Sequence, residues 1–448
     1  MRFAVATLGC KVNQYDSAMI EARMQAEGHE LTRFDAPADV YIVNTCTVTD
    51  RADSESVRLA RRARRLNPSA RVIATGCLAQ ATPERLARAN EIDAVVGLGR
   101  LEEILRAARG ESSARVVVDN LRRRRTVIEL APVAPRGQTR AFLKVQEGCD
   151  QFCTFCIVPF SRGTSRSVEP RRIIAALDDL GRRGFKEVVL TGVHLGGYGR
   201  DLTPPVTLDD LLEMVAERSP IGRVRVSSLD PEELSDRAIA IVAQSEKFCP
   251  HFHLPLQAGV DPILRRMRRR YDTAAYRGLL ERILKAMPEA SLGTDLIVGF
   301  PGESGDDFER GFDFVASLPL SYLHVFPYST RSGTTAAKYQ NKVETHEIRR
   351  RSARMRELAR QQQERFAERF KGQTLKVLLE DRARAGLLAG YSRNYIRVEA
   401  CGGDWLRNHE VEIHALDRCG AVLAGRVVSG QGRSGSPGAE TGGAATAC

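Results

Sequence analysis

The sequence predicts an α/β protein of three parts: an N-terminal parallel α/β domain, a central partial (β/α)6 barrel and a small C-terminal β barrel. Short apolar strands alternate with amphipathic helices over residues 1–112 and again over residues 135–365, as in parallel βα repeats. Residues 371–429 show short alternating strands separated by turn residues, a pattern typical of OB-like barrels. The Gly/Ser/Ala-rich segment 430–448 cannot build a core, and we predict a disordered tail.

Length and composition agree with this division. A chain of 448 residues is long enough for several domains, and 43% apolar with 27% charged residues is typical of a globular protein. No apolar run approaches the roughly 20 residues that a membrane helix needs, so we expect no membrane partner. The N-terminus lacks a signal-peptide pattern. Its 10 cysteines therefore favour a reducing compartment, and we predict a cytoplasmic protein.

The first domain carries three cysteines at matching positions. Its predicted strands are residues 3–8, 41–45, 71–75 and 94–98. Cys10, Cys46 and Cys77 directly follow the first three. Because parallel strands present their carboxyl ends at one sheet edge, where ligands bind in open α/β folds, these thiols should converge. Cysteine is also a common buried residue, but three in register favour a three-thiolate metal site.

A basic linker separates this domain from the central one. Residues 122–125 are four arginines, and the stretch 132–137 contains proline and glycine. Such a run is either solvated or in contact with phosphate. The net charge of +11 is concentrated in the two flanks of the chain. That distribution fits either a polyanionic partner or a solvated basic surface.

The central domain repeats the βα unit six times. The predicted strands are residues 142–145, 187–191, 223–229, 252–256, 292–298 and 322–328. This repetition predicts an open six-stranded barrel with its active site at the carboxyl ends of the strands. His253 lies inside an apolar strand, where a histidine more often makes structural hydrogen bonds than it acts in catalysis.

The loop after the first of these strands contains Cys149, Cys153 and Cys156 in the pattern CxxxCxxC. Three thiolates can hold three corners of an iron-sulfur cube and leave the fourth iron open for a substrate or cofactor. A structural zinc site would need a fourth cysteine or a nearby histidine, and neither flanks this loop. The pattern therefore favours a redox cluster. Cys249, Cys401 and Cys419 have no such pattern, and we predict packing roles for them.

A long Arg-rich helix over residues 346–371 is predicted to bridge the central and last domains. The strands of the last domain are expected at residues 374–380, 387–391, 395–400, 410–416 and 422–428. Small barrels of this type bind RNA through exposed aromatic and basic side chains. Arg393, Tyr395 and Trp405 are our candidates for RNA stacking and phosphate contact, although tyrosines in alternating strands are as often part of a core.

The cysteine loop followed by βα units resembles the radical S-adenosylmethionine (SAM) family. Three further signatures, residues 8–13, 44–48 and 75–80, precede it, and a small barrel of the TRAM type closes the chain. This order resembles the methylthiotransferases over roughly residues 1–428. The sequence Gly-Cys-Lys-Val-Asn around Cys10 resembles that of the branch that acts on N6-threonylcarbamoyladenosine at tRNA position 37. The alternatives are the branches that modify N6-isopentenyladenosine in tRNA or an aspartate of a ribosomal protein.

The resemblance implies an enzyme that adds a methylthio group to C2 of the modified adenosine by radical SAM chemistry. Its cofactors would be SAM and two 4Fe-4S clusters, one on Cys149, Cys153 and Cys156 and an auxiliary one on Cys10, Cys46 and Cys77. No catalytic side chain beyond these ligands is implied. The partners would be the tRNA anticodon stem-loop and an external electron donor, and we expect a monomer.

The resemblance also implies a set of SAM contacts at strand ends. The residues at the matching positions are Phe155, Thr191, Gly192, Ser227, Ser228, Gln257, Gly299 and Glu303. Thr191 and Gly192 would equally suit plain strand termination. Two positions depart from the family pattern. Ala258 replaces a commoner serine, and Glu303 sits one residue later than the usual glutamate.

Overall fold

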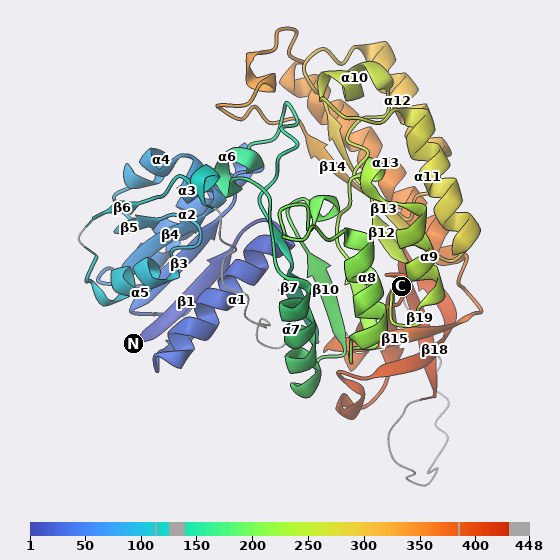
Figure 1. Cartoon of the computed structure of the whole chain (residues 1–448), viewed down its shortest axis with the longest axis horizontal. Coiled ribbons are helices and arrows are strands. Elements are labelled where there is room, and N and C mark those ends of the chain that lie inside the picture. Colours follow the sequence, from blue (N-terminus) through green and yellow to red (C-terminus); the bar gives the residue numbers. More distant parts are fainter. Residues whose placement is uncertain (113, 125–138, 384–385, 430–448) are drawn as a thin grey trace.

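Figure 1 shows the computed structural model, which describes residues 1–112, 114–124, 139–383 and 386–429. The predicted Pro/Gly stretch 132–137 and the predicted tail 430–448 lie outside the described residues. The fold-class prediction is confirmed: a parallel sheet domain, an open βα barrel and a closed β barrel follow one another along the chain. No helix in the part of the chain that the structure describes has both the length and the apolar character needed to cross a bilayer.

The N-terminal domain is a six-stranded, wholly parallel sheet in the order β2-β1-β3-β4-β5-β6. The strands are β1 (Arg2–Thr7), β2 (Glu30–Leu31), β3 (Val40–Thr45), β4 (Arg71–Gly76), β5 (Ala94–Val96) and β6 (Val116–Val117). The four predicted strands all form. The two edge strands were not predicted, because two residues are too few to show a periodic pattern.

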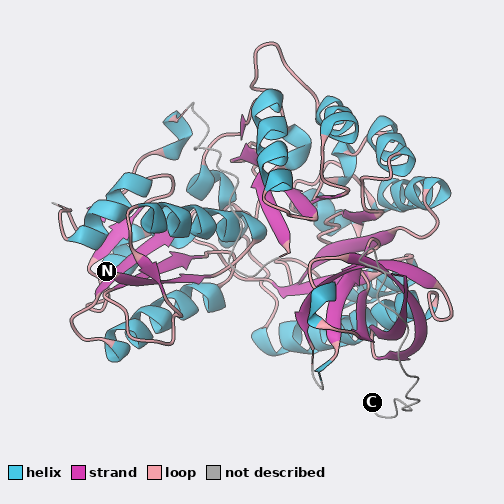
Figure 2. Ribbon diagram, turned by 90° about the horizontal axis from the view of Figure 1, so that it is seen from below, coloured by secondary structure: helices cyan, strands magenta, loops and turns pink. Residues whose placement is uncertain are grey.

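Helices cover both faces of this sheet (Figure 2). The helices α1 (Lys11–Ala26) and α5 (Leu101–Arg109) pack on one face, and α2 (Asp50–Leu66), α3 (Cys77–Ala81) and α4 (Pro83–Ala87) pack on the other. The central strand β3 is buried at every position. This burial explains its nearly continuous apolar sequence, since a parallel strand covered on both faces shows no polar alternation.

The central domain is an open barrel whose strands keep their chain order. Two parallel sheets, β11-β10-β7 and β12-β13-β14, are linked by a bridge between Val224 and Phe248 and by a hydrogen bond from the Leu229 N–H to the His253 backbone oxygen. The strands are β7 (Arg140–Lys144), β10 (Glu187–Thr191), β11 (Arg223–Val226), β12 (His251–His253), β13 (Ser291–Val298) and β14 (Tyr322–Pro327). A short antiparallel pair, β8 (Gln146–Glu147) and β9 (Arg166–Ser167), was not predicted.

Apolar side chains point outward from these strands onto the surrounding helices, and mostly polar side chains point inward. The covering helices include α7 (Pro170–Arg182), α8 (Leu208–Arg218), α9 (Asp236–Gln244), α11 (Thr273–Ala286) and α12 (Gly305–Ser317). Ala141 and Leu143 of β7 belong to this outer core, whereas Phe142 packs inward with Tyr15 and Ala18 of α1. The helix α1 therefore lies against the inner face of the barrel and joins the first two domains.

The helix α13 (Thr345–Glu368) bridges to the last domain, as predicted. That domain is a closed barrel in the order β15-β16-β17-β19-β18. Its strands are β15 (Thr374–Arg382), β16 (Leu388–Ser392), β17 (Arg397–Cys401), β18 (Glu410–Cys419) and β19 (Val422–Ser429). All five were predicted. The packing role predicted for Cys249 agrees with its burial, but Cys401 and Cys419 are exposed, so the packing prediction is wrong for these two.

A buried charge network fixes the C-terminal barrel against the amino-terminal ends of β10 and β11. Glu187 accepts hydrogen bonds from Arg223 at 2.8 Å and from Arg225 at 2.7 Å. The same two guanidinium groups donate to backbone oxygens of Tyr391 and Ser392 in the barrel. Burial alone would raise the pKa of Glu187, but the two arginines outweigh it and lower the pKa to about 2. Buried charges are tolerated only when paired, so the barrel completes the core.

Arg393 belongs to this interface. Its guanidinium bonds Glu410 at 2.8 Å and donates to backbone oxygens of Gly222 and Glu246 in the central domain. We predicted RNA contact for this side chain. The structure gives its donors protein partners instead, because the loop after β16 faces the central domain. Trp405 differs, since 63% of its surface is exposed.

Candidate active site

The cysteine loop of the central domain lies at the carboxyl end of β7, between β8 and α6 (Val158–Arg162). Burial raises the pKa of Cys156 to about 12, and the neighbouring Cys153 thiol contributes. The Gln151 backbone N–H donates to Cys149 Sγ at 3.4 Å, and Arg269 donates to Cys153 Sγ at 3.3 Å. Donors aimed at sulfur stabilise thiolates. Three adjacent sulfurs with such donors fit a 4Fe-4S cluster that keeps one iron open.

The three cysteines of the N-terminal domain follow adjacent strands, β1, β3 and β4. Burial, then the nearby Cys77 and Cys10 thiols, raise the pKa of Cys46 to about 12, as expected for three thiols that lie near one another. Gly9 has a φ of +97°, and a Cβ there would lie 2.8 Å from Cys46 Sγ. The turn after β1 therefore leaves space beside Cys46 that only glycine preserves. This donor set also fits an iron-sulfur cluster with an open iron.

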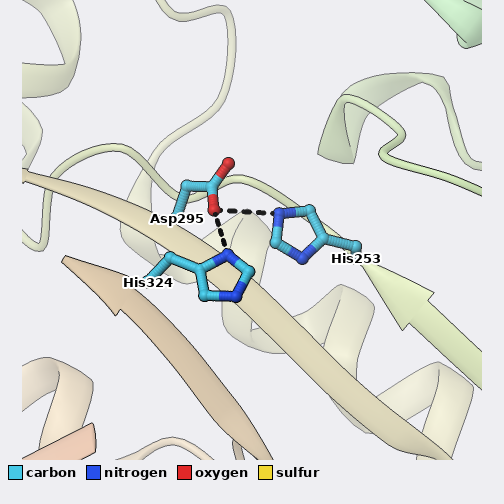
Figure 3. Close-up of side chains that lie close together, drawn as sticks. All are labelled: His253, Asp295 and His324. Atoms are coloured by element: carbon cyan, nitrogen blue, oxygen red, sulfur yellow. Dashed lines mark hydrogen bonds and ion pairs between the residues drawn. The ribbon is translucent and has the colours of Figure 1, made fainter. Parts of the chain in front are cut away.

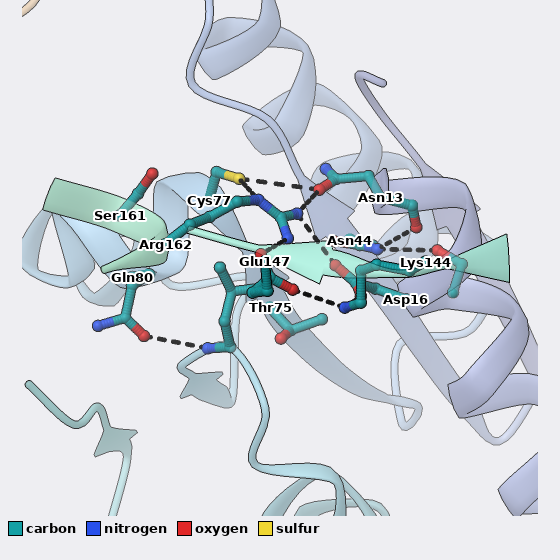
Figure 4. A network of polar contacts seen from close by, with 12 residues as sticks. Asn13, Asp16, Asn44, Thr75, Cys77, Gln80, Lys144, Glu147, Ser161 and Arg162 are labelled. Carbon is teal, nitrogen blue, oxygen red and sulfur yellow. Dashed lines mark hydrogen bonds and ion pairs between the residues drawn. The ribbon is translucent and has the colours of Figure 1, made fainter. Parts of the chain in front are cut away.

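One arginine of the central domain reaches the cysteine site of the N-terminal domain (Figure 4). Arg162 comes from α6, directly after the Cys149–Cys156 loop, and is 2% exposed. Its Nε donates to Cys77 Sγ at 3.3 Å, and its terminal nitrogens donate to Glu147 at 2.6 Å and to Asp16 at 3.0 Å. A side chain of the central domain thus binds a predicted cluster ligand of the N-terminal domain.

Lys144 completes this network. Its ammonium donates to Asp16 and to Glu147, both at 2.6 Å. Two cations and two carboxylates therefore balance one another across the interface between the first two domains. Burial alone would raise the pKa of Glu147, but Arg162 and Lys144 lower it to about 2. None of these four residues is predicted as a site residue from the sequence. The sequence offered one signal for a buried charge pair. A lysine and a glutamate lie in or beside a buried strand, just before the CxxxCxxC loop.

The signature asparagines position the cysteine turns. Asn13 donates to the backbone oxygens of Leu8 and Thr45 at 2.7 and 2.9 Å, which ties the ends of β1 and β3 together. Asn44 donates to the Asn13 backbone oxygen at 2.9 Å. Gln80 of the third signature accepts from the Leu98 N–H at 3.0 Å. The three signatures therefore share a scaffold of buried amide hydrogen bonds (Figure 4).

The predicted SAM contacts lie at the carboxyl ends of β10 to β13, the edge that also carries the Cys149–Cys156 loop. Thr191 is buried, and Phe155 packs against the central core. A Cβ at Gly192 would meet the Gln146 side chain at 3.0 Å. Ser227 is buried with no hydrogen-bond partner for its Oγ among the described residues, whereas Ser228 is exposed. An orphaned buried hydroxyl fits a bound polar ligand.

The remaining contacts involve backbone turns. Gln257 has a φ of +69°, and its backbone N–H donates to the backbone oxygen of Asp295 at 2.9 Å. Glu303 accepts from the Gly299 N–H at 2.7 Å and from Arg351 at 2.9 Å. Its carboxylate is therefore occupied in holding the turn after β13. This finding favours a positioning role for Glu303 over direct contact with SAM.

Two histidine clusters lie on the strand ends and the inner face of the barrel. Asp295 accepts from His253 and from His324, both at 3.0 Å, from three adjacent strands (Figure 3). His253 also bonds the Tyr322 hydroxyl at 3.0 Å, as expected of a structural histidine. Burial alone would raise the pKa of Asp295, but the two imidazoles hold it below its usual range. His194 makes a similar pair with Glu233 at 2.7 Å, beside Gln151 of the cysteine loop.

A cavity of about 330 Å³ opens where the three domains meet. Its lining comes from the start of α1, from the inner face of β7, β10 and β11, and from the C-terminal barrel. The residues are Lys11, Gln14, Thr139, Arg140, Phe142, Val189, Arg225, Glu380, Asp381 and Tyr395. Lys11 directly follows Cys10. Burial, Arg140 and Arg225 lower the pKa of Lys11 to about 8.

Comparison with known proteins agrees with this arrangement. The model of an uncharacterized protein family, UPF0004, matches residues 2–97, and the radical SAM superfamily model matches residues 143–315. A solved radical SAM methyltransferase, TsrM from Kitasatospora setae, shares the fold with a TM-score of 0.55 at 14% identity. The match covers 73% of this chain and 74% of that chain.

Several curated relatives match along most of their length. The threonylcarbamoyladenosine tRNA methylthiotransferase MtaB of Bacillus subtilis (strain 168) is 37% identical, over 92% of this chain and 93% of its own. MtaB of Aquifex aeolicus (strain VF5) is 38% identical, over 90% of this chain and 97% of its own. A tRNA-2-methylthio-N(6)-dimethylallyladenosine synthase of Clostridium novyi (strain NT) is 32% identical, over 85% of each chain. The chain therefore belongs to the radical SAM methylthiotransferase family, in the branch of the MtaB proteins.

Proposed function

We propose that this enzyme adds a methylthio group to C2 of N6-threonylcarbamoyladenosine at position 37 of tRNA. The names of the MtaB relatives support this substrate, and the dimethylallyladenosine synthases match at lower identity. One observation carries the proposal: the chain holds two three-cysteine sites, and Arg162, which follows the Cys149–Cys156 loop, bonds Cys77 of the other site. Insertion of sulfur at an unactivated carbon requires a radical source and a sulfur source at one place.

The chain's own residues supply position and surroundings for the cofactors. When bound, SAM and the two 4Fe-4S clusters supply the radical and the sulfur, while the protein orients them. Cys149, Cys153 and Cys156 would hold the SAM-binding cluster, and Cys10, Cys46 and Cys77 the auxiliary one. Arg162 and Arg269 donate hydrogen bonds to one sulfur in each set. Such bonds favour the thiolate form that a metal needs.

The proposal extends to organisation and partners. We assign residues 1–112 to the methylthiotransferase domain, 135–365 to the radical SAM core and 371–429 to the TRAM domain. The tRNA anticodon stem-loop is the substrate, an external donor supplies electrons, and the protein acts as a cytoplasmic monomer. The basic net charge of +11 and the exposed Trp405 on the small barrel support RNA binding.

Mass spectrometry of nucleosides tests the substrate. The anaerobically reconstituted enzyme, SAM, sulfide and a reductant are incubated with tRNAs that carry either threonylcarbamoyladenosine or isopentenyladenosine. Methylthiolation of threonylcarbamoyladenosine alone is expected. Conversion of isopentenyladenosine instead would assign the chain to the sister branch. SAM cleavage without methylthio product from either tRNA would indicate a protein substrate.

Two cysteine variants test the division of labour in the same assay. Cys153→Ala should abolish SAM cleavage, because its site would hold the SAM-binding cluster. Cys46→Ala should preserve SAM cleavage and lose the methylthio product, since the two sites lie in separate domains. Cys249→Ala, a buried cysteine outside both sites, is the matched control and should retain both activities. Methylthio product from the Cys46 variant would refute the auxiliary site.

A further inference from the structure

Lys11 is the unpaired cation of the cavity where the three domains meet. Arg140 pairs with Glu380 at 2.6 Å, and Arg225 pairs with Glu187 at 2.7 Å. Over the described residues, no hydrogen bond or ion pair within bonding distance reaches the ammonium of Lys11, whose side chain is only partly exposed. An ammonium withdrawn from water without a partner is unfavourable, so this position is suited to an incoming anion.

The other charged groups around the cavity are paired or exposed, so Lys11 is the group suited to bind an anion. Glu187 and Glu380 are occupied by arginines, as described above. Asp381 is largely exposed and lies 3.9 Å from Arg407. Asp295 and Glu187 are the carboxylates whose charge reaches Lys11, without forming an ion pair with it. Among the described residues, the cavity therefore presents one uncompensated positive charge together with the amide of Gln14.

Aromatic rings complete the cavity wall. The Tyr395 ring stacks on Tyr391 at 4.9 Å between centroids, and the Arg225 guanidinium lies 5.1 Å from the Tyr395 centroid. Phe142 of the central domain also contributes to the lining. At about 330 Å³, the cavity lies at the small end of the range for ligand sites, enough for a group the size of an amino acid. The rings supply rigid apolar surface and Lys11 supplies a positive charge, a combination that suits a small group with an apolar part and an anionic end.

We propose that this cavity receives the threonylcarbamoyl substituent of the substrate, with Lys11 Nζ bound to its carboxylate. This inference rests on the proposed function. The threonylcarbamoyl group ends in a free carboxylate, whereas an isopentenyl group carries no charge. In adenine, C2 and C6 flank the same ring nitrogen, so a base with C2 at the cysteine sites extends its N6 substituent a short way beyond them. Lys11 directly follows Cys10 in the chain, so its side chain begins beside the N-terminal cysteine site.

Binding of synthetic anticodon stem-loops tests the carboxylate contact. Three stem-loops differ only at position 37: threonylcarbamoyladenosine, its methyl ester and unmodified adenosine. The ester keeps the shape of the substituent and removes its charge. Fluorescence anisotropy at one salt concentration gives each Kd. A charge-assisted hydrogen bond predicts that the cluster-loaded enzyme binds the acid about 10- to 100-fold more tightly than the ester.

Lys11 variants locate the effect. Lys11→Met should remove the preference for the acid and leave the Kd of the ester and of the unmodified stem-loop unchanged. Lys11→Arg should retain most of the preference, because it keeps the charge. Lys285→Met, an exposed lysine on the outer helix α11, is the matched control and should change nothing. Iron and sulfide content of each variant shows whether both clusters are loaded.

Three results would overturn the inference. The first is equal affinity of the wild-type enzyme for the acid and the ester, a result that contradicts the inference without any variant. Lys11→Met could keep the preference for the acid. Lys11→Met could also weaken the binding of all three stem-loops equally, as expected if Lys11 contacts a phosphate. Methylthio product without a carboxylate preference overturns only this inference, whereas absence of product from threonylcarbamoyladenosine tRNA refutes the proposed function.

Discussion

At the scale of single residues, Arg162 stands out because its buried guanidinium joins a cysteine, two carboxylates and Asn13 across a domain interface. Its bonds to Cys77 and Asp16 cross the interface, so its full set of partners is present only while the two domains stay docked. Glu147 belongs to the same domain as Arg162 and is buried between Arg162 and Lys144. Buried networks of this kind are favourable only when every member is satisfied.

Arg162→Met is therefore expected to destabilise the cluster-free protein by about 3–5 kcal/mol, because Glu147 and Asp16 lose a buried partner. Urea unfolding monitored by circular dichroism measures the change. Arg171→Met is the matched control: Arg171 pairs with Glu169 at 2.8 Å on the surface, and its side chain is 85% exposed. The control should unfold at the wild-type urea concentration. Equal midpoints for both variants would contradict a stabilising role for the network.

The cysteines could be predicted from sequence, but the residues around them could not. Spacing after parallel strands identified both thiol sets, because strand ends converge by topology alone. Arg162, Lys144 and Asp16 looked like surface charges, since their partners are up to 149 residues away and several of them depend on how two domains dock. The misplaced RNA contact at Arg393 has the same origin, because the exposure of an arginine in a loop depends on the neighbouring domain.

At the scale of elements, the turn between β1 and α1 has the strictest requirement for glycine. Gly9 adopts a φ of +97° beside Cys46, so the turn places backbone where any side chain would meet a thiol. The strands themselves were predictable within a few residues, because apolar runs bounded by turn residues mark them. The two-residue strands β2, β6, β8 and β9 were not, since their formation depends on pairing rather than on local pattern.

Gly9→Ala should empty the auxiliary site and spare the SAM-binding site. The added Cβ would lie 2.8 Å from Cys46 Sγ, a distance that forces the thiol or the turn to move. We expect the reconstituted variant to hold about half the wild-type iron while it still cleaves SAM. Gly28→Ala is the matched control, because Gly28 has a φ of +82° but nothing within 4 Å of its added Cβ. Full iron content in the Gly9 variant would show that the turn tolerates a side chain.

At the scale of the whole molecule, the C-terminal barrel is bound to the core through buried charges. Its removal would leave Arg223 and Arg225, the partners of Glu187, without the barrel's backbone oxygens. A truncated protein would therefore lose core stability together with RNA affinity. A point substitution on the exposed side of the barrel separates these two effects.

Trp405→Ala should weaken tRNA binding by about 5- to 100-fold, since a base stacked on an aromatic side chain contributes about 1–3 kcal/mol. Because the indole is exposed, the unfolding transition should not move. The salt dependence of binding should also stay the same, as no phosphate contact is lost. Leu416→Ala, at another exposed apolar residue of the barrel, is the control. Wild-type affinity in the Trp405 variant would exclude stacking at this position.

The loop after β16 contributes Tyr395 to the cavity that Lys11 enters, and it is also the loop that anchors the barrel to the core. The barrel is thus not an independent module, because one wall of this cavity belongs to it. Exchange of barrels between related enzymes would exchange that wall as well. Under the proposals above, selectivity for the modified base and affinity for the tRNA would therefore change together when the barrel changes.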